Sequence, residues 1–415
     1  MIYINDIERT IPYTRCDVKS LTSNYLPKVV FMPKKKKAVS EVSSGLFGII
    51  HSNRTTESHW GKNCFNSSFP TAMACYMLSN DIPAIYNMLS VVDGKLKVVA
   101  SEISLSKVFN CGAMNFDNLD FCFESKFEPY QEYSFDNIDA IDLVIKTTSG
   151  CFLAPMEIKL TVLPTSNTSR LPEDEWGCEL VVRSATTSYC ALGMFDSVRD
   201  ETRAVRELFE EACSGVGSWT NDFEMSHKTP ALTECINSFQ FRYLAKQKPL
   251  LMQTIWKTQG QSPLLADNAF DIVIWSDYAF SRLFLDSALD AEQTMSRPMR
   301  ASAKLARCLW ELSKSGKIRI GEIYRQMAFD TQTDKEFAIQ GQKWRSYVAS
   351  KRIIDPILSK NVISKIIEPG FIEHLRPERR FDQTLYFTVR NEQRQIQPIQ
   401  YIKAAEGAKS GSYKY

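Results

Sequence analysis

Residues 135–160 of this 415-residue chain constrain its fold more than any other stretch, because they read as one β-hairpin. Residues 141–146 (IDLVIK) are rich in β-branched side chains and bounded by polar residues, which is typical of a strand. Thr-Thr-Ser-Gly at 147–150 supplies a turn, and residues 151–160 return as a second apolar run. Residues two apart in a strand face the same side, so Glu157 and Lys159 share one face.

The register of the hairpin decides whether a third charged residue, Asp142, joins these two. If the turn is a two-residue loop at 149–150, Asp142 lies directly opposite Glu157, with Cβ atoms roughly 5 Å apart. A four-residue loop would offset the two carboxylates diagonally but keep them on one face. Pro155 inside the second strand implies an edge position or a bulge, and a bulge would shift this register.

Two carboxylates this close repel each other unless a cation lies between them. A hard divalent ion such as Mg²⁺ binds one or two carboxylates, waters and phosphate oxygens at about 2.0–2.1 Å. Lys159 beside it would polarise or deprotonate an attacking water and offset charge on a phosphorane-like transition state. Asp142, Glu157 and Lys159 are therefore the candidate catalytic residues, with Asp142 and Glu157 as metal ligands. The alternative is that the Glu-Ile-Lys face is only solvated surface.

The order of elements predicts an α/β (α+β) fold with a mixed central sheet flanked by helices and a largely helical C-terminal region. Residues 178–184 read as a further strand and residues 187–198 as a helix. Asp271 heads an apolar run at 270–277 that has no Glu-x-Lys nearby and reads as a core strand. The expected domains are 1–290 for the core with an N-terminal elaboration, 291–405 for a basic helical DNA-contacting region, and 406–415 for a disordered tail.

Other sequence features exclude several classes of protein. The eleven cysteines include no C-x-x-C pair and the four histidines are far apart, which argues against a zinc knuckle and a disulfide scaffold. The N-terminus carries charges where a signal peptide needs an apolar region, and no run of 18 apolar residues exists. We expect a cytoplasmic protein without a membrane segment. No P-loop motif is present, so ATP-driven activity is not expected.

A local excess of positive charge marks residues 297–352. This segment holds thirteen Lys or Arg against five acids, an excess of eight in a chain whose net charge is only +2. Residues 302–315 read as a helix ended by Gly316, with Arg300, Lys304 and Arg307 spaced along one face. Such a face would neutralise DNA phosphates. The candidate DNA-binding residues are Arg300, Lys304, Arg307, Lys343 and Arg345. The alternative is a solvated helical face rich in arginine.

Two segments together resemble a known family. Residues 59–77 (HWGKNCFNSSFPTAMACYM) and 141–164, which contain IDLVIK and MEIKLTVLP, resemble the HindVP-like type II restriction endonucleases of the PD-(D/E)xK nuclease superfamily. The resemblance implies a restriction-endonuclease-like core and Mg²⁺-dependent cleavage of double-stranded DNA at a short, partly degenerate palindrome, of the GRCGYC type. It also implies a cognate DNA methyltransferase. A palindromic target favours a homodimer, because each active site cuts one strand.

The sequence departs from the superfamily pattern at one position. Ile141 stands where a proline would precede the first acid, which leaves Asp139 as an alternative metal-ligating acid. Asp142 is preferred because its strand runs directly into the turn and pairs with Glu157. Two other functions stay open: a DNA repair or structure-specific nuclease with the same metal site, and a non-catalytic DNA-binding protein.

Overall fold

The computed structural model describes the central part of the chain most fully. The described residues are 70, 73–74, 77–78, 80–114, 118–164, 180–258, 265–289, 295–329, 335–339, 353, 356 and 358–359. Most of the 59–77 block and the 406–415 tail lie outside these residues. None of the helices within these ranges has the length and apolar character that a bilayer-spanning segment needs.

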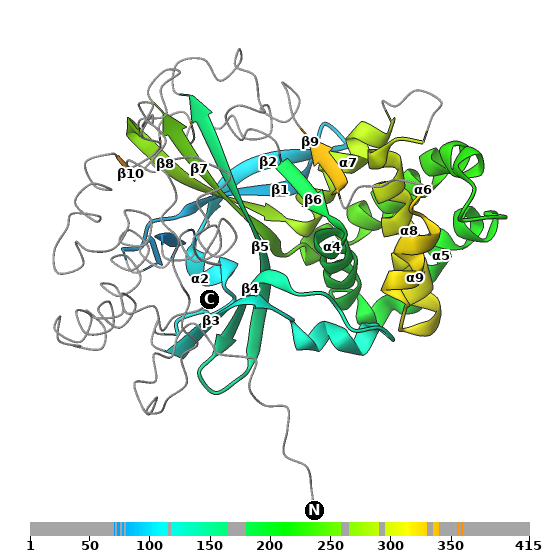
Figure 1. Ribbon diagram of the computed structural model, residues 1–415, viewed down its shortest axis with the longest axis horizontal. Helices are drawn as coiled ribbons and strands as arrows, with labels where there is room; N and C mark the ends of the chain where they lie inside the picture. Colours follow the sequence, from blue (N-terminus) through cyan, green and yellow to red (C-terminus); the bar gives the residue numbers. More distant parts are fainter. Residues whose placement is uncertain are drawn as a thin grey trace, which may run out of the picture.

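One mixed sheet forms the centre of the molecule, as the sequence predicts (Figure 1). Its strand order is β2-β1-β8-β7-β5-β4-β3, and β10 also pairs with β8. The β5–β7 and β1–β8 pairs are parallel and the other pairs are antiparallel. The strands are β1 (Ala84–Val92), β2 (Lys95–Ile103), β3 (Leu119–Ser125), β4 (Ile141–Thr147), β5 (Phe152–Pro164), β7 (Pro249–Thr258), β8 (Leu265–Ser276) and β10 (Leu358–Ser359).

Strand β5 joins two halves of this sheet. Its first part, residues 152–156, pairs with β4, and its second part, residues 157–164, pairs with β7. Figure 1 shows β5 crossing the molecule from the β3–β4 hairpin at the bottom to β7 and β8 at the top. Residue 157 therefore lies at the point where β5 changes partners.

Helices gather at one end of the sheet and over one of its faces (Figure 1). The α-helices are α2 (Leu105–Val108), α4 (Ser184–Asp196), α5 (Thr202–Ser214), α6 (Asp222–Arg242), α7 (Asp277–Leu289), α8 (Arg297–Ser315) and α9 (Ile320–Gln326). The 3₁₀ turns are η3 (Glu128–Tyr133), η4 (Arg199–Glu201) and η5 (Leu244–Lys246). Helices α7 and α8 contribute to the same hydrophobic core, so this core contains residues from both sides of position 290.

The two faces of the sheet bury separate cores, because side chains alternate along each strand. Leu251 and Trp275 belong to the core under the helices, whereas their neighbours Met252 and Ile274 belong to the opposite core with α2. Val144 also belongs to the helical side. Glu157 pairs in register with Leu251 and so lies on the helical side of the sheet.

Several elements confirm their sequence predictions and one differs. The helix expected to end at Gly316 does so, with Gly316 at a φ of +71°. The 270–277 run is a core strand, and Asp271 is buried in it. The strand expected at 178–184 is present as β6 (Leu180–Arg183), but it pairs with β9 (Lys335–Ile339) in a separate two-stranded sheet and not with the central sheet. Its partner is more than 150 residues away, which local sequence cannot reveal.

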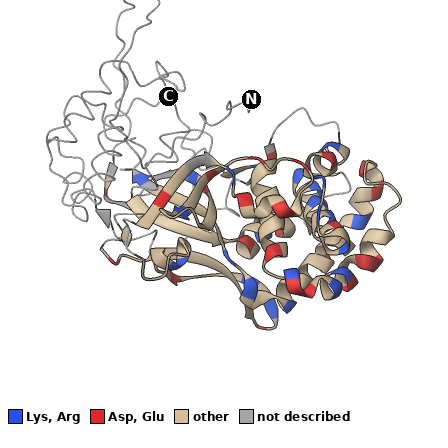
Figure 2. Cartoon of the chain, turned by 90° about the horizontal axis from the view of Figure 1, so that it is seen from below, with Lys and Arg blue, Asp and Glu red and all other residues tan. Residues whose placement is uncertain are grey.

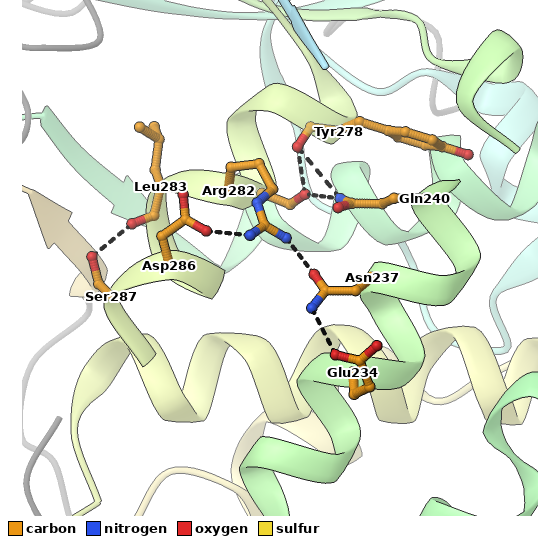
Figure 3. Close-up of polar contacts among 9 residues, drawn as sticks. Glu234, Asn237, Gln240, Tyr278, Arg282, Leu283, Asp286 and Ser287 are labelled. Atoms are coloured by element: carbon orange, nitrogen blue, oxygen red, sulfur yellow. Dashed lines mark hydrogen bonds and ion pairs between the residues drawn. The ribbon is translucent and has the colours of Figure 1, made fainter. Parts of the chain in front are cut away.

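A network of polar side-chain contacts joins α6 to α7 (Figure 3). The Arg282 guanidinium is buried and contacts Asn237 of α6 and Asp286 of its own helix. Asn237 in turn donates to Glu234 at 3.1 Å. Burying a guanidinium costs folding free energy unless the group is paired and hydrogen-bonded. This network therefore favours the pairing of helix faces that is observed.

A buried carboxyl at the start of α7 predicts how stability depends on pH. Asp277 accepts backbone hydrogen bonds from Lys248 at 3.0 Å and from Tyr278 at 2.8 Å. Burial nevertheless raises the pKa of Asp277 from 3.8 to about 7. The folded protein therefore holds this proton more tightly than the unfolded chain. The resulting stability is fully present below pH 3.8 and is lost as pH rises through about 7.

We expect Asp277→Asn to remove this part of the pH dependence. An asparagine keeps the accepting oxygen but cannot ionise, so its advantage over wild type should grow from pH 5 to pH 8, on the order of 1–3 kcal/mol. Urea unfolding at both pH values measures this difference. The control is Asp93→Asn, whose exposed carboxylate pairs with Lys97 on the surface. Parallel pH profiles for wild type and Asp277→Asn would contradict the prediction.

Candidate active site

The hairpin that carries the candidate residues closes with a turn that differs from both expected loops. Thr147 donates its N–H to the Cys151 carbonyl at 2.8 Å, so the loop comprises the three residues 148–150. Gly150 closes it at a φ of +93°, a conformation that favours glycine. A one-residue register shift then follows between Ile145 and Lys146.

This shift restores the expected register between β4 and β5 next to Asp142. Beyond it, Val144 pairs with Pro155 and Leu143 pairs with Met156. Continuing by one residue sets Asp142 opposite Glu157, as the sequence predicts for a two-residue loop. The loop length was therefore wrong and the pairing at the site was right, because a bulge absorbed the extra residue.

Pro155 has the kind of position that its missing N–H requires. One edge of β5 faces β4 at this point, and the other edge pairs with β7 only from Glu157 onward. Pro155 thus pairs with β4 on one side while the other edge of β5 is unpaired at this residue, in agreement with the expected edge position.

Asp142, Glu157 and Lys159 converge on one point on the helical side of the sheet. The Lys159 Nζ atom lies 2.5 Å from Glu157 Oε1 and 4.0 Å from Asp142 Oδ2. The side chains of Asp142 and Lys159 are 23% and 24% exposed, and that of Glu157 is 8% exposed. The site is therefore a partly open charged cluster at the point where β5 changes partners.

Asp142 also has a structural contact that fixes its carboxylate. Asp142 Oδ2 accepts the backbone N–H of Ile158 at 2.8 Å, across the hairpin. Ile158 itself points into the opposite core. This bond ties the head of β4 to the residue between Glu157 and Lys159, so the three side chains have little freedom to separate.

The charges of this cluster hold Lys159 in its protonated form. Burial by itself lowers the pKa of Lys159, but the charges of Glu157 and Asp142, with the Glu157 hydrogen bond, outweigh it and raise the pKa overall. Arg183, at the end of β6, acts in the opposite direction. In this state Lys159 is a cation and a hydrogen-bond donor, not a base.

The donor set fits a hard divalent cation. Asp142 and Glu157 supply carboxylate oxygens, the ligands that Mg²⁺ prefers, and both already converge on one positive charge, the Lys159 ammonium. Among the described residues, no group of three or more His, Cys, Asp or Glu could hold a metal ion. Two carboxylates with waters and phosphate oxygens are the sparse coordination typical of Mg²⁺.

The two alternatives for the first acid lie in different surroundings. Asp139 lies three residues before Asp142, in the segment that enters β4, and its side chain is exposed. Its backbone carbonyl accepts the hydroxyl proton of Tyr189 at 3.0 Å. Asp142, not Asp139, contacts the Glu157 and Lys159 region.

The expected basic face along α8 is not an exposed surface, and this corrects the sequence prediction. Lys304 is 4% exposed and donates to Glu336 of β9 at 2.7 Å. Arg307 is 7% exposed and bonds Glu311 at 2.7 Å. Arg300 is half-buried, and burial lowers its pKa. Figure 2 shows basic and acidic residues interspersed over the helices. Lys343 and Arg345 lie outside the described residues.

Two residues near the site escaped the sequence analysis. Arg183 ends β6 and precedes α4, and its charge acts on Lys159. The Tyr189 hydroxyl, on α4, accepts from the Phe127 N–H at 3.0 Å and donates to the segment that leads to Asp142. A basic residue between a strand and a helix was a usable signal for Arg183. No local pattern marks Tyr189.

Comparison with known proteins identifies the family. The chain matches the HindVP restriction endonuclease family over residues 60–391. It is 33% identical to the type II restriction enzyme HgiDI of Herpetosiphon aurantiacus over 348 residues, 83% of this chain and 96% of that enzyme. It is 31% identical to the probable type II restriction enzyme HindVP of Haemophilus influenzae over 360 residues, 86% of this chain and 97% of that protein. No solved structure matches. The chain therefore belongs to the HindVP restriction endonuclease family and is a type II restriction enzyme.

Proposed function

We propose that this enzyme hydrolyses phosphodiester bonds of double-stranded DNA at Asp142, Glu157 and Lys159, in a reaction that depends on Mg²⁺. The observation that carries this proposal is the convergence of two carboxylates and one ammonium on a partly open point of the sheet. Membership of a restriction endonuclease family supports DNA as the substrate. A solvated Glu-Ile-Lys surface would not need the cross-strand contact between Asp142 and the Ile158 N–H.

Each of the three residues has a distinct role in this proposal. Asp142 and Glu157 hold the Mg²⁺, which when bound polarises the scissile phosphate and lowers the pKa of a coordinated water. Lys159 orients the attacking water and, as a cation, offsets the negative charge that develops on the phosphate oxygens. The water oxygen bonds to phosphorus and loses one proton to solvent, the bond from phosphorus to one sugar oxygen breaks, and that oxygen takes up one proton from solvent.

Binding of a divalent ion changes the balance at Lys159. The carboxylate charges that now raise the pKa of Lys159 would then be shared with the metal. The pKa of Lys159 would then be lower than in the metal-free site. In the metal-free site, the Lys159 ammonium is the counter-ion of both carboxylates.

Family membership supports four further proposals about the activity. We propose a short, partly degenerate palindromic target of the GRCGYC type and a homodimer that presents one active site to each strand. We also propose action in the cytoplasm beside a cognate DNA methyltransferase that protects host DNA.

Digestion of DNA of known sequence tests the proposal. Purified protein with Mg²⁺ should give discrete fragments whose sequenced ends share one palindrome, and excess EDTA should abolish cleavage. Glu157→Gln protein, purified in parallel, controls for contaminating nucleases. Fragments without a common end sequence would favour a structure-specific nuclease. Intact DNA at all Mg²⁺ concentrations would refute the catalytic proposal.

A further inference from the structure

A cavity of about 390 Å³ opens beside the candidate active site. Its walls come from three elements: the segment 136–139 that enters β4, one side of α4, and α9. The polar side chains of the lining include Asp136, Asp139, Ser184, Tyr189, Tyr324 and Arg325. The lining combines hydroxyl, acidic and basic groups and is therefore suited to a polar ligand.

Two contacts place the inner end of this cavity next to the candidate active site. Tyr189 lines the cavity and bonds the Asp139 carbonyl. Burial first, and then the charges of Asp139 and Glu157, raise the pKa of Tyr189 to about 12, so its hydroxyl lies near both acids. Ser184, also in the wall, directly follows Arg183, whose charge acts on Lys159. The inner end of the cavity therefore lies at the segment 136–139 and the start of α4, which lead to Asp142 and follow Arg183.

A group of basic and aromatic residues lies at the outer end of the cavity. We call it the α9 rim, and it consists of Phe135, Lys317, Arg319 and Arg325. Phe135 is 59% exposed, so its ring is accessible at the surface. The charged groups of Lys317 and Arg319 lie over its ring, at 6.0 and 5.3 Å from the centroid. Backbone hydrogen bonds of Ile318 with Tyr133 and Phe135 fix this arrangement.

The acids around the rim offset only part of its positive charge. Asp136 accepts the Gly321 N–H at 3.2 Å and pairs with Arg319 at 3.8 Å, so it partly offsets the charge of one of the three rim cations. Glu322 of α9 accepts a hydrogen bond from Gln326. Among the described residues, no acid pairs with the exposed Arg325 guanidinium in the cavity wall. Asp139 lies at the inner end of the cavity, toward the proposed metal site.

We propose that the α9 rim binds the sugar–phosphate backbone of DNA beside the scissile bond, with Arg325, Lys317 and Arg319 contacting phosphates and Phe135 packing on a sugar or base. This inference rests on the proposed function, because it takes its occupant from the adjoining nuclease site. Lysine and arginine ion-pair with phosphates, and guanidinium groups do so with two hydrogen bonds. In this proposal, residues 317–325 contact DNA phosphates, the role that the sequence analysis gave to the basic side chains of α8.

Salt-dependent DNA binding tests the rim directly. The variant is Lys317→Gln/Arg319→Gln/Arg325→Gln, measured in EDTA so that no DNA is cut, by fluorescence anisotropy with a labelled duplex. Three lost phosphate contacts should flatten the slope of log affinity against log salt by about 2 to 3, and affinity at low salt should fall roughly tenfold or more. With Mg²⁺, KM should rise while kcat stays near the wild-type value.

A matched control removes the same amount of positive charge elsewhere. Lys95→Gln/Lys97→Gln/Arg203→Gln changes three exposed cations on β2 and α5, and its slope should match wild type. The single variant Arg325→Gln breaks no ion pair within the described residues, so it tests the proposal even if the triple variant unfolds. It should reduce the slope by about 1.

The outcomes for the rim and for the nuclease function are separate. Equal slopes for wild type and the rim variants, or an equal loss in the control variant, would overturn the rim. Failure of wild type to bind duplex DNA in EDTA would overturn it as well. Wild-type protein that binds DNA through the rim but never cuts it with Mg²⁺ would instead refute the proposed catalytic function.

Discussion

Replacing Glu157 by glutamine should lower the rate of DNA cleavage by roughly 10³-fold or more and leave metal-free DNA binding close to wild type. Glutamine has nearly the same shape but carries no charge, so it removes one of the two carboxylates that contact Lys159 among the described residues. A loss of several kcal/mol of transition-state stabilisation corresponds to that factor, since about 1.4 kcal/mol is tenfold in rate. Cleavage with Mg²⁺ and anisotropy binding in EDTA measure the two effects.

The control for this variant is Asp93→Asn, which removes an exposed carboxylate in the β1–β2 turn. It should cut DNA at the wild-type rate, because surface ion pairs contribute little. If Glu157→Gln keeps more than a tenth of the wild-type rate, the assignment of Glu157 as a metal ligand is wrong. If it loses DNA binding in EDTA as well, the carboxylate serves the fold and not the reaction.

Replacing Lys159 by methionine should also reduce cleavage by roughly 10³-fold, and it should increase the rise in melting temperature that Mg²⁺ causes. Methionine keeps the apolar stem but removes the ammonium that contacts Glu157 at 2.5 Å. The two carboxylates then repel each other without compensation, so the free energy of unfolding in EDTA should fall. A divalent ion restores the missing positive charge. The melting temperature should therefore rise more with Mg²⁺ in this variant than in wild type.

Lys146→Met provides the comparison for Lys159→Met, because it changes a lysine of the same hairpin away from the site. Lys146 lies over the Phe152 ring at 3.8 Å, so its loss should cost a little stability and no activity. An equal Mg²⁺ response in both variants would show that Lys159 does not compete with a metal for the carboxylates. Wild-type cleavage by Lys159→Met would remove it from the mechanism.

The Lys159 ammonium compensates the buried Glu157 carboxylate, which limits the cost of burying its charge. Under the proposed mechanism, a divalent ion would have to displace this ammonium and would bind more weakly than to two bare carboxylates. The proposal therefore predicts that metal affinity depends on the charge of residue 159.

The α8 helix shows where prediction from sequence failed. The spacing of Arg300, Lys304 and Arg307 was read correctly as one face of a helix, but the direction of that face was not. Glu336, which pairs with Lys304, is 32 residues away and lies on a strand of a second sheet. A buried partner that distant in sequence turns a predicted solvent face inward, and no periodicity within the helix records it.

By itself, the sequence determined the β4–β5 hairpin, the shared face of Glu157 and Lys159, and the mixed sheet with helices, because these depend on period-two alternation and short-range turns. It left open the choice between Asp142 and Asp139. The tertiary structure places Asp142 4.0 Å from Lys159, through a one-residue bulge and a bond across the hairpin. It also decided that basic side chains of α8 are buried and that those of the α9 rim are exposed, because burial and ion pairing depend on contacts between segments far apart in the chain.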